Sequence, residues 1–93
     1  MSFDAKTREQ VRLSLLRILD AGAPRGFSLP LLAQMIRAEG FNVDAESLRA
    51  ELSYLRDKNL VETVVKQVSP EIQLWRITAF GRDVYAEAAN EVA

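Results

Sequence analysis

The stretch DAESLRAELSYLRDKNLVE, residues 44–62, decides the fold that the sequence predicts. Asp44 has the residue type and position of a helix N-cap, and Val43 and Leu48 have the spacing of a hydrophobic staple around it. Leucines then recur at the spacing that buries one helical face, and Asn59 can adopt the left-handed conformation that ends a helix. We therefore expect a helix that leads directly into a strand. The leucine stripe consists of Leu48, Leu52 and Leu55.

The residues that follow predict a β-hairpin and a closing helix. Residues 60–67 are rich in β-branched side chains, which favours a strand, and residues 69–71 are typical of a turn. A returning strand is expected over residues 72–77, after which Thr78 caps a last helix that frays near Asn90. The apolar residues of this helix are Phe80, Val84, Tyr85 and Ala88.

Two further helices precede the opening stretch. The first is expected over residues 4–21, with Gly22 just past its end, and residues 23–26 form a loop. The second has Ser28 as its N-cap and ends at Gly40. The order helix, helix, helix, hairpin, helix predicts an α+β, mostly α, winged helix-turn-helix. The apolar faces consist of Val11, Leu15, Leu16, Ile18 and Leu19 in the first helix, and of Leu32, Met35 and Ile36 in the second.

Length and composition indicate a single globular domain. A chain of 93 residues leaves no room for a second core, so we expect one domain over residues 1–93 with its core at about residues 5–89. The N-terminus lacks the apolar segment of a signal peptide, and no apolar run approaches the roughly 20 residues that span a bilayer. These patterns predict a cytoplasmic protein without a membrane partner.

The residue types argue against catalysis. The sequence contains no histidine and no cysteine, so the usual nucleophile, base and metal-ligand sets are missing. The four glycines are scattered and form no phosphate-cradling loop. We therefore expect neither an enzyme nor a bound metal or cofactor.

Two segments resemble winged-helix regulators. SYLRDKNLVE, residues 53–62, resembles the end of the recognition helix and the first wing strand of these proteins. LWRITAFGRDVYAEA, residues 74–88, is similar to their second wing strand and closing helix. The resemblance covers about residues 7–89. The spacing of the motifs also resembles that in small winged-helix proteins of Mu-like prophages. The residues that carry the second motif are Trp75, Arg76, Ile77, Thr78, Gly81 and Arg82.

The resemblance implies a transcription regulator that binds double-stranded DNA sequence-specifically, with the third helix in a major groove and the wing against the phosphates or the minor groove. Arg49 and Arg56 lie on one flank of the third helix, seven residues and two turns apart. Arg37 from the second helix and Arg25 from the preceding loop extend this basic set. The remaining candidate contacts are Ser47, Ser53 and Tyr54 on the third helix and Lys66 at the base of the wing.

The acidic residues of the same helix favour a second interpretation. Glu46 and Asp57 lie opposite the leucine stripe, where carboxylates would repel phosphate, and Glu51 is expected with Lys58 on the second flank. The net charge is −1, whereas most small proteins that hold nucleic acid are basic. A protein–protein interaction module without DNA binding therefore stays open, in which the arginines only solvate a helix flank. The usual role of the fold favours DNA, and we take that as the leading hypothesis.

The predicted hairpin has a mainly structural role. Its basic residue is Lys66 at the base, and Glu71 near the turn carries the opposite charge. This is too little positive charge to bind phosphate. Trp75 could stack on a base, but it shares a strand face with Ile77. Packing in a core or an interface is therefore the favoured role of this tryptophan.

The first and last helices carry a candidate interface. Leu13 faces away from the apolar stripe of the first helix, so this helix is apolar on two sides. Such a helix often buries its second side against a partner, and a symmetric homodimer is the assembly that we expect. The alternative is that Leu13 is a single exposed leucine. The residues that complete the candidate interface are Tyr85, Ala89 and Val92 of the last helix.

Overall fold

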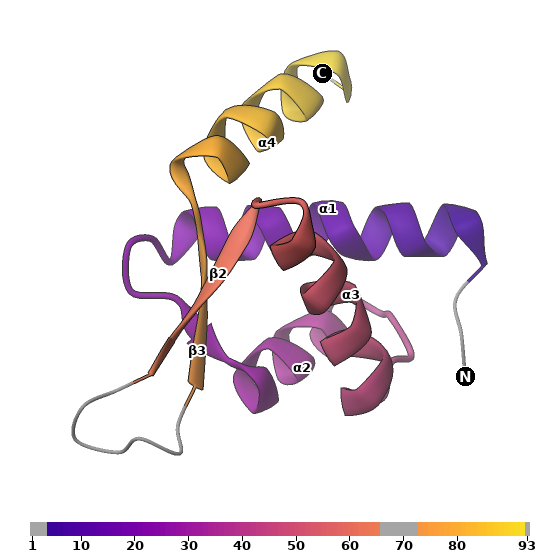
Figure 1. Ribbon diagram of the computed structural model, residues 1–93. Helices are drawn as coiled ribbons and strands as arrows, with labels where there is room; N and C mark the ends of the chain where they lie inside the picture. Colours follow the sequence, from indigo (N-terminus) through magenta and orange to yellow (C-terminus); the bar gives the residue numbers. More distant parts are fainter. Residues whose placement is uncertain (1–3, 66–72, 93) are drawn as a thin grey trace.

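The computed structural model describes residues 4–65 and 73–92, which form the predicted α+β, mostly helical, winged helix-turn-helix fold (Figure 1). The three strands of the described part form one antiparallel sheet in the order β1-β3-β2. Part of the predicted hairpin lies outside the described residues. This part contains Lys66, the turn at 69–71, and the strand ends at residues 67 and 72. The elements are α1 (Ala5–Ala21), β1 (Phe27–Ser28), α2 (Leu29–Ala38), α3 (Ala45–Asp57), β2 (Val61–Val65), β3 (Gln73–Ile77) and α4 (Ala79–Val92).

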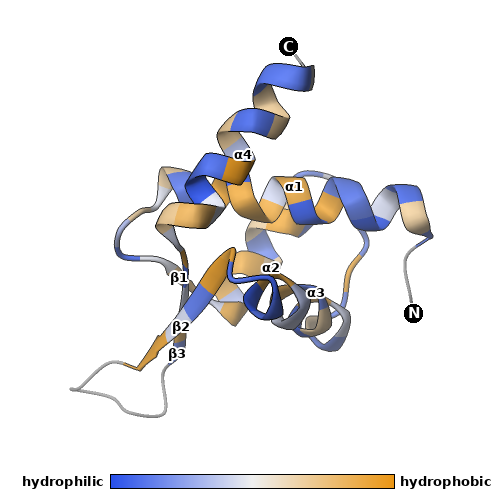
Figure 2. Cartoon of the chain, turned by 45° about the horizontal axis from the view of Figure 1, so that its top comes forward, coloured by the Kyte–Doolittle hydropathy of each residue, from blue (hydrophilic) through white to orange (hydrophobic). Residues whose placement is uncertain are grey.

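The core lies between the three N-terminal helices and the inner face of the sheet. α1 packs against α2, α3, α4 and β3, and Figure 2 shows hydrophobic residues gathered where α1 meets the rest of the body. The predicted leucine stripe of α3 is buried, as are the inward residues Val61 and Ile77 of the sheet. Trp75 is only 3% exposed on the same face as Ile77, which confirms its packing in the core.

The short strand β1 was not among the predicted elements. Phe27 pairs with Trp75 and Ser28 pairs with Leu74 across the edge of β3. Gly26 makes this pairing possible, because it has φ +85° and because a Cβ at this position would lie 2.3 Å from the carbonyl oxygen of Trp75. Two residues are too short for a strand pattern to appear in the sequence.

Both ends of α3 follow the prediction. Asp44 Oδ1 accepts a hydrogen bond of 2.7 Å from the Ser47 backbone N–H, and Asn59 ends the helix region with φ 64°. Asp4 caps α1 in the same way through the N–H of Thr7. Ser28 is the N-cap of α2, but its side chain makes no capping hydrogen bond.

The corner between β3 and α4 also has the predicted cap. The Thr78 hydroxyl donates to the Asn59 carbonyl oxygen at 2.6 Å and accepts the Gly81 N–H at 2.9 Å. Two details of α4 were predicted wrongly. The helix continues to Val92 instead of fraying near Asn90, and Phe80 is 56% exposed instead of contributing to an apolar face. Gly81 packs against the carbonyl of Leu60, so the adjacent Phe80 turns outward.

The cap of α3 should make stability depend on pH in the acid range. The hydrogen bond from the Ser47 N–H holds the pKa of the Asp44 carboxyl below its usual value. A lowered pKa in the folded state stabilises the fold fully above the unfolded pKa, and this contribution is lost as the pH falls through the folded pKa. We expect Asp44→Ala to lower the thermal midpoint at pH 7, and to lower it less at about pH 3.

The control for this prediction is Asp44→Asn, which keeps an acceptor for the cap but carries no charge. Its thermal midpoint at pH 7 should lie above that of Asp44→Ala. Equal midpoints for wild type and Asp44→Ala at pH 7 would show that this cap does not stabilise α3.

Candidate nucleic-acid interface

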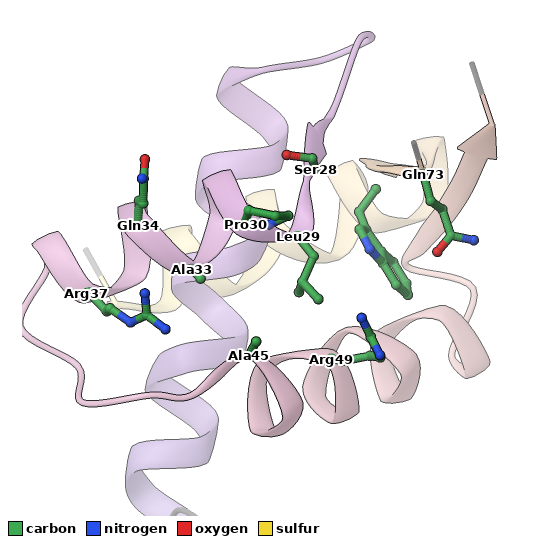
Figure 3. Close-up of a pocket in the computed structure, with 10 residues that line it drawn as sticks. Ser28, Leu29, Pro30, Ala33, Gln34, Arg37, Ala45, Arg49 and Gln73 are labelled. Atoms are coloured by element: carbon green, nitrogen blue, oxygen red, sulfur yellow. The ribbon is translucent and has the colours of Figure 1, made fainter. Parts of the chain in front are cut away.

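A concave pocket of about 790 Å³ opens between α2, the first turns of α3 and the strand β3. Figure 3 shows the side chains of these elements around it. Its lining contains two arginines and, among the residues that the structure describes, no aspartate or glutamate. The pocket therefore offers a cationic and hydrogen-bonding surface over an apolar floor. The residues that line it are Ser28, Leu29, Pro30, Ala33, Gln34, Arg37, Ala45, Arg49, Gln73 and Trp75.

Arg37 lies at one end of the pocket and also holds the helix-turn-helix together. Its Nε donates a hydrogen bond of 3.1 Å to the carbonyl oxygen of Val43, in the connection between α2 and α3. In Figure 3 its guanidinium lies between α2 and the Ala45 end of α3. The side chain thus places a fixed positive charge at the start of α3.

Arg49 supplies the second positive charge. It is exposed on α3 one turn after Ala45, and in Figure 3 its guanidinium points from α3 into the pocket. Gln34 of α2 and Gln73 of β3 also line the pocket and add amide donors and acceptors. Two guanidinium groups with neutral hydrogen-bonding partners can bind phosphate oxygens or the acceptor edges of bases.

The N-terminus of α2 contributes to the same surface. Ser28 and Pro30 both line the pocket, and the Ser28 hydroxyl makes no capping hydrogen bond to the helix. The first N–H groups of a helix have no partners within it and carry partial positive charge, which favours an anion. Pro30 has no N–H, so any donors at this end of the pocket come from the other residues of the first turn.

The other predicted arginines lie elsewhere. Arg56 packs over β3, where its guanidinium carbon is 5.7 Å from the centroid of the Trp75 ring. Arg25 is exposed in the loop before β1. Neither residue lines the pocket, so the structure brings together Arg37 and Arg49 but not all four.

The predicted polar contacts of α3 also separate. Ser47 lies in the first turn, where its N–H binds the Asp44 cap, and Ser53 is half-buried. Tyr54 is 40% exposed, but the Arg12 guanidinium carbon of α1 lies 3.7 Å from its ring centroid. Tyr54 is therefore on the α1 side of α3. None of the three lines the pocket.

Glu51 requires a correction. Its position in the helix predicts a place beside Lys58 on a flank of α3, but Glu51 is only 8% exposed. The reason is that Arg12 of α1 donates a hydrogen bond of 2.6 Å to its Oε1, so its charge is paired inside the fold. Glu46 and Asp57, in contrast, are exposed as expected.

Three residues that line the pocket were not predicted as contacts: Ser28, Leu29 and Gln34. Gln34 had a usable signal, because it lies three residues before Arg37 and so on the same face of α2.

These elements define the chain as a winged helix-turn-helix protein by fold. No protein-family model matches the sequence, and no curated protein is significantly similar to it. None of the helices within residues 4–65 and 73–92 is long and apolar enough to cross a membrane.

Solved structures share the fold at low sequence identity. The transcriptional regulator BldR from Sulfolobus solfataricus superposes with a TM-score of 0.74 and 23% identity, over 87% of this chain and 52% of BldR. The transcriptional regulator PcaV from Streptomyces coelicolor, in complex with its natural ligand, superposes with a TM-score of 0.73 and 17% identity, over 87% of this chain and 52% of PcaV. A variant of S. aureus MepR bound to an oligodeoxyribonucleotide superposes with a TM-score of 0.71 and 15% identity, over 88% of this chain and 58% of MepR. The chain thus spans between half and three-fifths of the length of these proteins.

Proposed function

We propose that this protein is a transcription regulator that binds double-stranded DNA sequence-specifically through the surface formed by α2, α3 and β3. The observation that carries the proposal is the pocket on that surface. Arg37 and Arg49 line it together with Ser28 and Pro30 from the N-terminus of α2, and no carboxylate is among its described lining residues. This is the combination of charge and donors that phosphates and base edges require.

The structural neighbours support the proposal. BldR and PcaV are described as transcriptional regulators, and the MepR variant is bound to an oligodeoxyribonucleotide. The spacing of the sequence motifs adds a finer proposal, namely a regulator derived from a Mu-like prophage. A regulator of this kind acts where the DNA is, in the cytoplasm of a bacterial host.

The test of the proposal is the fluorescence anisotropy of a labelled, mixed-sequence DNA duplex titrated with the protein at low and then moderate salt. We expect a Kd in the micromolar range that weakens steeply with salt, because bound arginines release counterions from the phosphates. The absence of binding even at low salt would contradict the proposal.

A second candidate function is favoured by the carboxylates of α3. Glu46 and Asp57 are exposed on the helix that would enter the groove, and the net charge of the chain is −1. Such a helix suits a protein partner whose surface carries basic residues. This function would replace DNA binding if the anisotropy titration showed no binding at low salt.

We also propose a symmetric homodimer formed by α1 and α4. Leu13 is half-buried but is not among the residues packed against the core, and α4 projects from the body away from α1 (Figure 1). Tyr85 packs partly against the core, and Ala89 is half-buried on the same helix. Val92 ends α4.

The proposed dimer can be tested by replacing Leu13 with a charged residue. We expect wild type to sediment as a dimer, and Leu13→Glu to sediment as a monomer because a buried unpaired carboxylate opposes association. Sedimentation velocity at several protein concentrations measures this. The control is Leu31→Glu, which changes an exposed leucine on α2 and should leave the dimer intact. A monomeric wild type would contradict the assembly.

A further inference from the structure

Glu51 is the one charged residue within residues 4–65 and 73–92 that is buried among the core. It lies on α3 two residues after Arg49, which at about 100° per residue places it on nearly the opposite side of the helix. A buried carboxylate is costly unless it is paired, so its environment needs a reason.

The partners of Glu51 come from the first half of α1. Arg12 Nε lies 2.6 Å from Glu51 Oε1, with side chains that are 24% and 10% exposed, and Arg8 Nε lies 3.7 Å from Oε2. Arg8 and Arg12 are four residues apart, so they face α3 from adjacent turns of one side of α1. The carboxylate thus joins two helices that are distant in sequence.

Arg12 also makes a second contact with α3. Its guanidinium carbon lies 3.7 Å from the centroid of the Tyr54 ring, which follows Glu51 by three residues on the same face of the helix. Lys58 Nζ lies 5.7 Å from the same centroid, one turn further along. One arginine of α1 is therefore held by two side chains of α3, from the side opposite the pocket.

We propose that Glu51, held by Arg12, is a positioning residue that sets the angle of α3 and so determines how Arg49 is presented to DNA. The proposal rests on the function proposed above. The two residues lie behind α3 and do not line the pocket, so their effect on DNA binding is exerted through the helix. A neutral amide in place of the carboxylate keeps the size of the side chain but loses the charge-assisted bond to Arg12.

The sign of the effect separates this role from simple electrostatics. Glu51→Gln removes a negative charge from the DNA-binding helix, so Coulomb attraction alone would tighten DNA binding. A displaced α3 would instead weaken the binding of DNA. We expect Glu51→Gln to raise the Kd for DNA about tenfold with an unchanged salt dependence, since no phosphate contact is removed.

The matched control is Glu39→Gln. Glu39 forms an ion pair with Arg17, which joins the same helix α1 to α2 instead of α3. The substitution and the change in net charge are the same, but α3 keeps its support. We expect Glu39→Gln to leave the Kd within about twofold of wild type, because surface ion pairs contribute little.

A second readout needs no DNA. Trp75 is the single tryptophan of the chain, is almost fully buried, and packs under Arg56 of α3. A shift of α3 should uncover it, so we expect acrylamide to quench its fluorescence more strongly in Glu51→Gln than in wild type or Glu39→Gln. Arg12→Lys, which keeps the charge but loses the fixed fork of the guanidinium, should act in the same direction if Glu51→Gln does not fold.

These two readouts separate the possible failures. If wild type does not bind DNA but the quenching rises in Glu51→Gln, the proposed function fails and the support of α3 by Glu51 stands. If Glu51→Gln and Arg12→Lys bind DNA as tightly as wild type, the positioning role is overturned. Unchanged quenching in both variants would overturn it as well.

Discussion

Replacing Arg37 and Arg49 together by alanine should weaken DNA binding about 10- to 100-fold and reduce its salt dependence. The two guanidinium groups are the positive charges that line the pocket among the described residues. Each phosphate contact contributes about 0.9 to the slope of log K against log salt, so the loss of two contacts should lower that slope by about two. Anisotropy titrations at three or more salt concentrations measure both quantities.

The control is a double variant with the same change in charge, Arg17→Ala with Arg82→Ala. Arg17 pairs with Glu39 and Arg82 pairs with Asp20, and neither lines the pocket. The loss of the bond from Arg37 to Val43 is checked by the thermal midpoint of Arg37→Ala alone. If the control variant lost as much affinity as the pocket variant, binding would depend on net charge and not on this surface.

Replacing Leu52 by alanine should cost about 2–5 kcal/mol of unfolding free energy, through lost burial and the cavity that it leaves. Leu52 is fully buried in the core beside the other leucines of α3. The total free energy of unfolding of a domain of this size is only about 5–15 kcal/mol, so the variant should be close to unfolding at 37 °C. Urea denaturation followed by circular dichroism measures the loss.

Leu31→Ala is the matched control, because Leu31 is 39% exposed on α2. Its substitution should change the unfolding free energy by less than about 0.5 kcal/mol. A similar loss in both variants would mean that the leucine stripe of α3 does not form the core.

Local features were predictable from the sequence because local interactions determine them. Asp44 binds a backbone N–H three residues away, and Asn59 has its left-handed conformation next to the helix that it ends. The leucine spacing of α3 likewise needs no knowledge of the partner helices. The number and order of the helices follow from such signals.

Features that depend on distant residues were missed. Glu51 was assigned to a flank of α3 because a helical wheel contains no information about Arg12, which is 39 positions away in the sequence. Strand β1 is defined by its pairing with β3 and not by its own two residues. Phe80 faces outward because its neighbour Gly81 packs against the Leu60 carbonyl.

The candidate site was predictable in part. Residue type was enough to name Arg37 and Arg49, which the fold brings to one pocket. The same criterion also named Arg25 and Arg56, which lie outside it, because residue type does not show where a side chain points.

The most direct test of the DNA-binding surface is the amide NMR spectrum of the ¹⁵N-labelled protein during titration with a DNA duplex. We predict the largest shifts at the N-terminus of α2, in the first half of α3 and in β3, with Gln34, Arg49 and Gln73 among them. Shifts confined to α1 and α4, with these residues unmoved at saturation, would contradict the proposal that the pocket surface binds DNA.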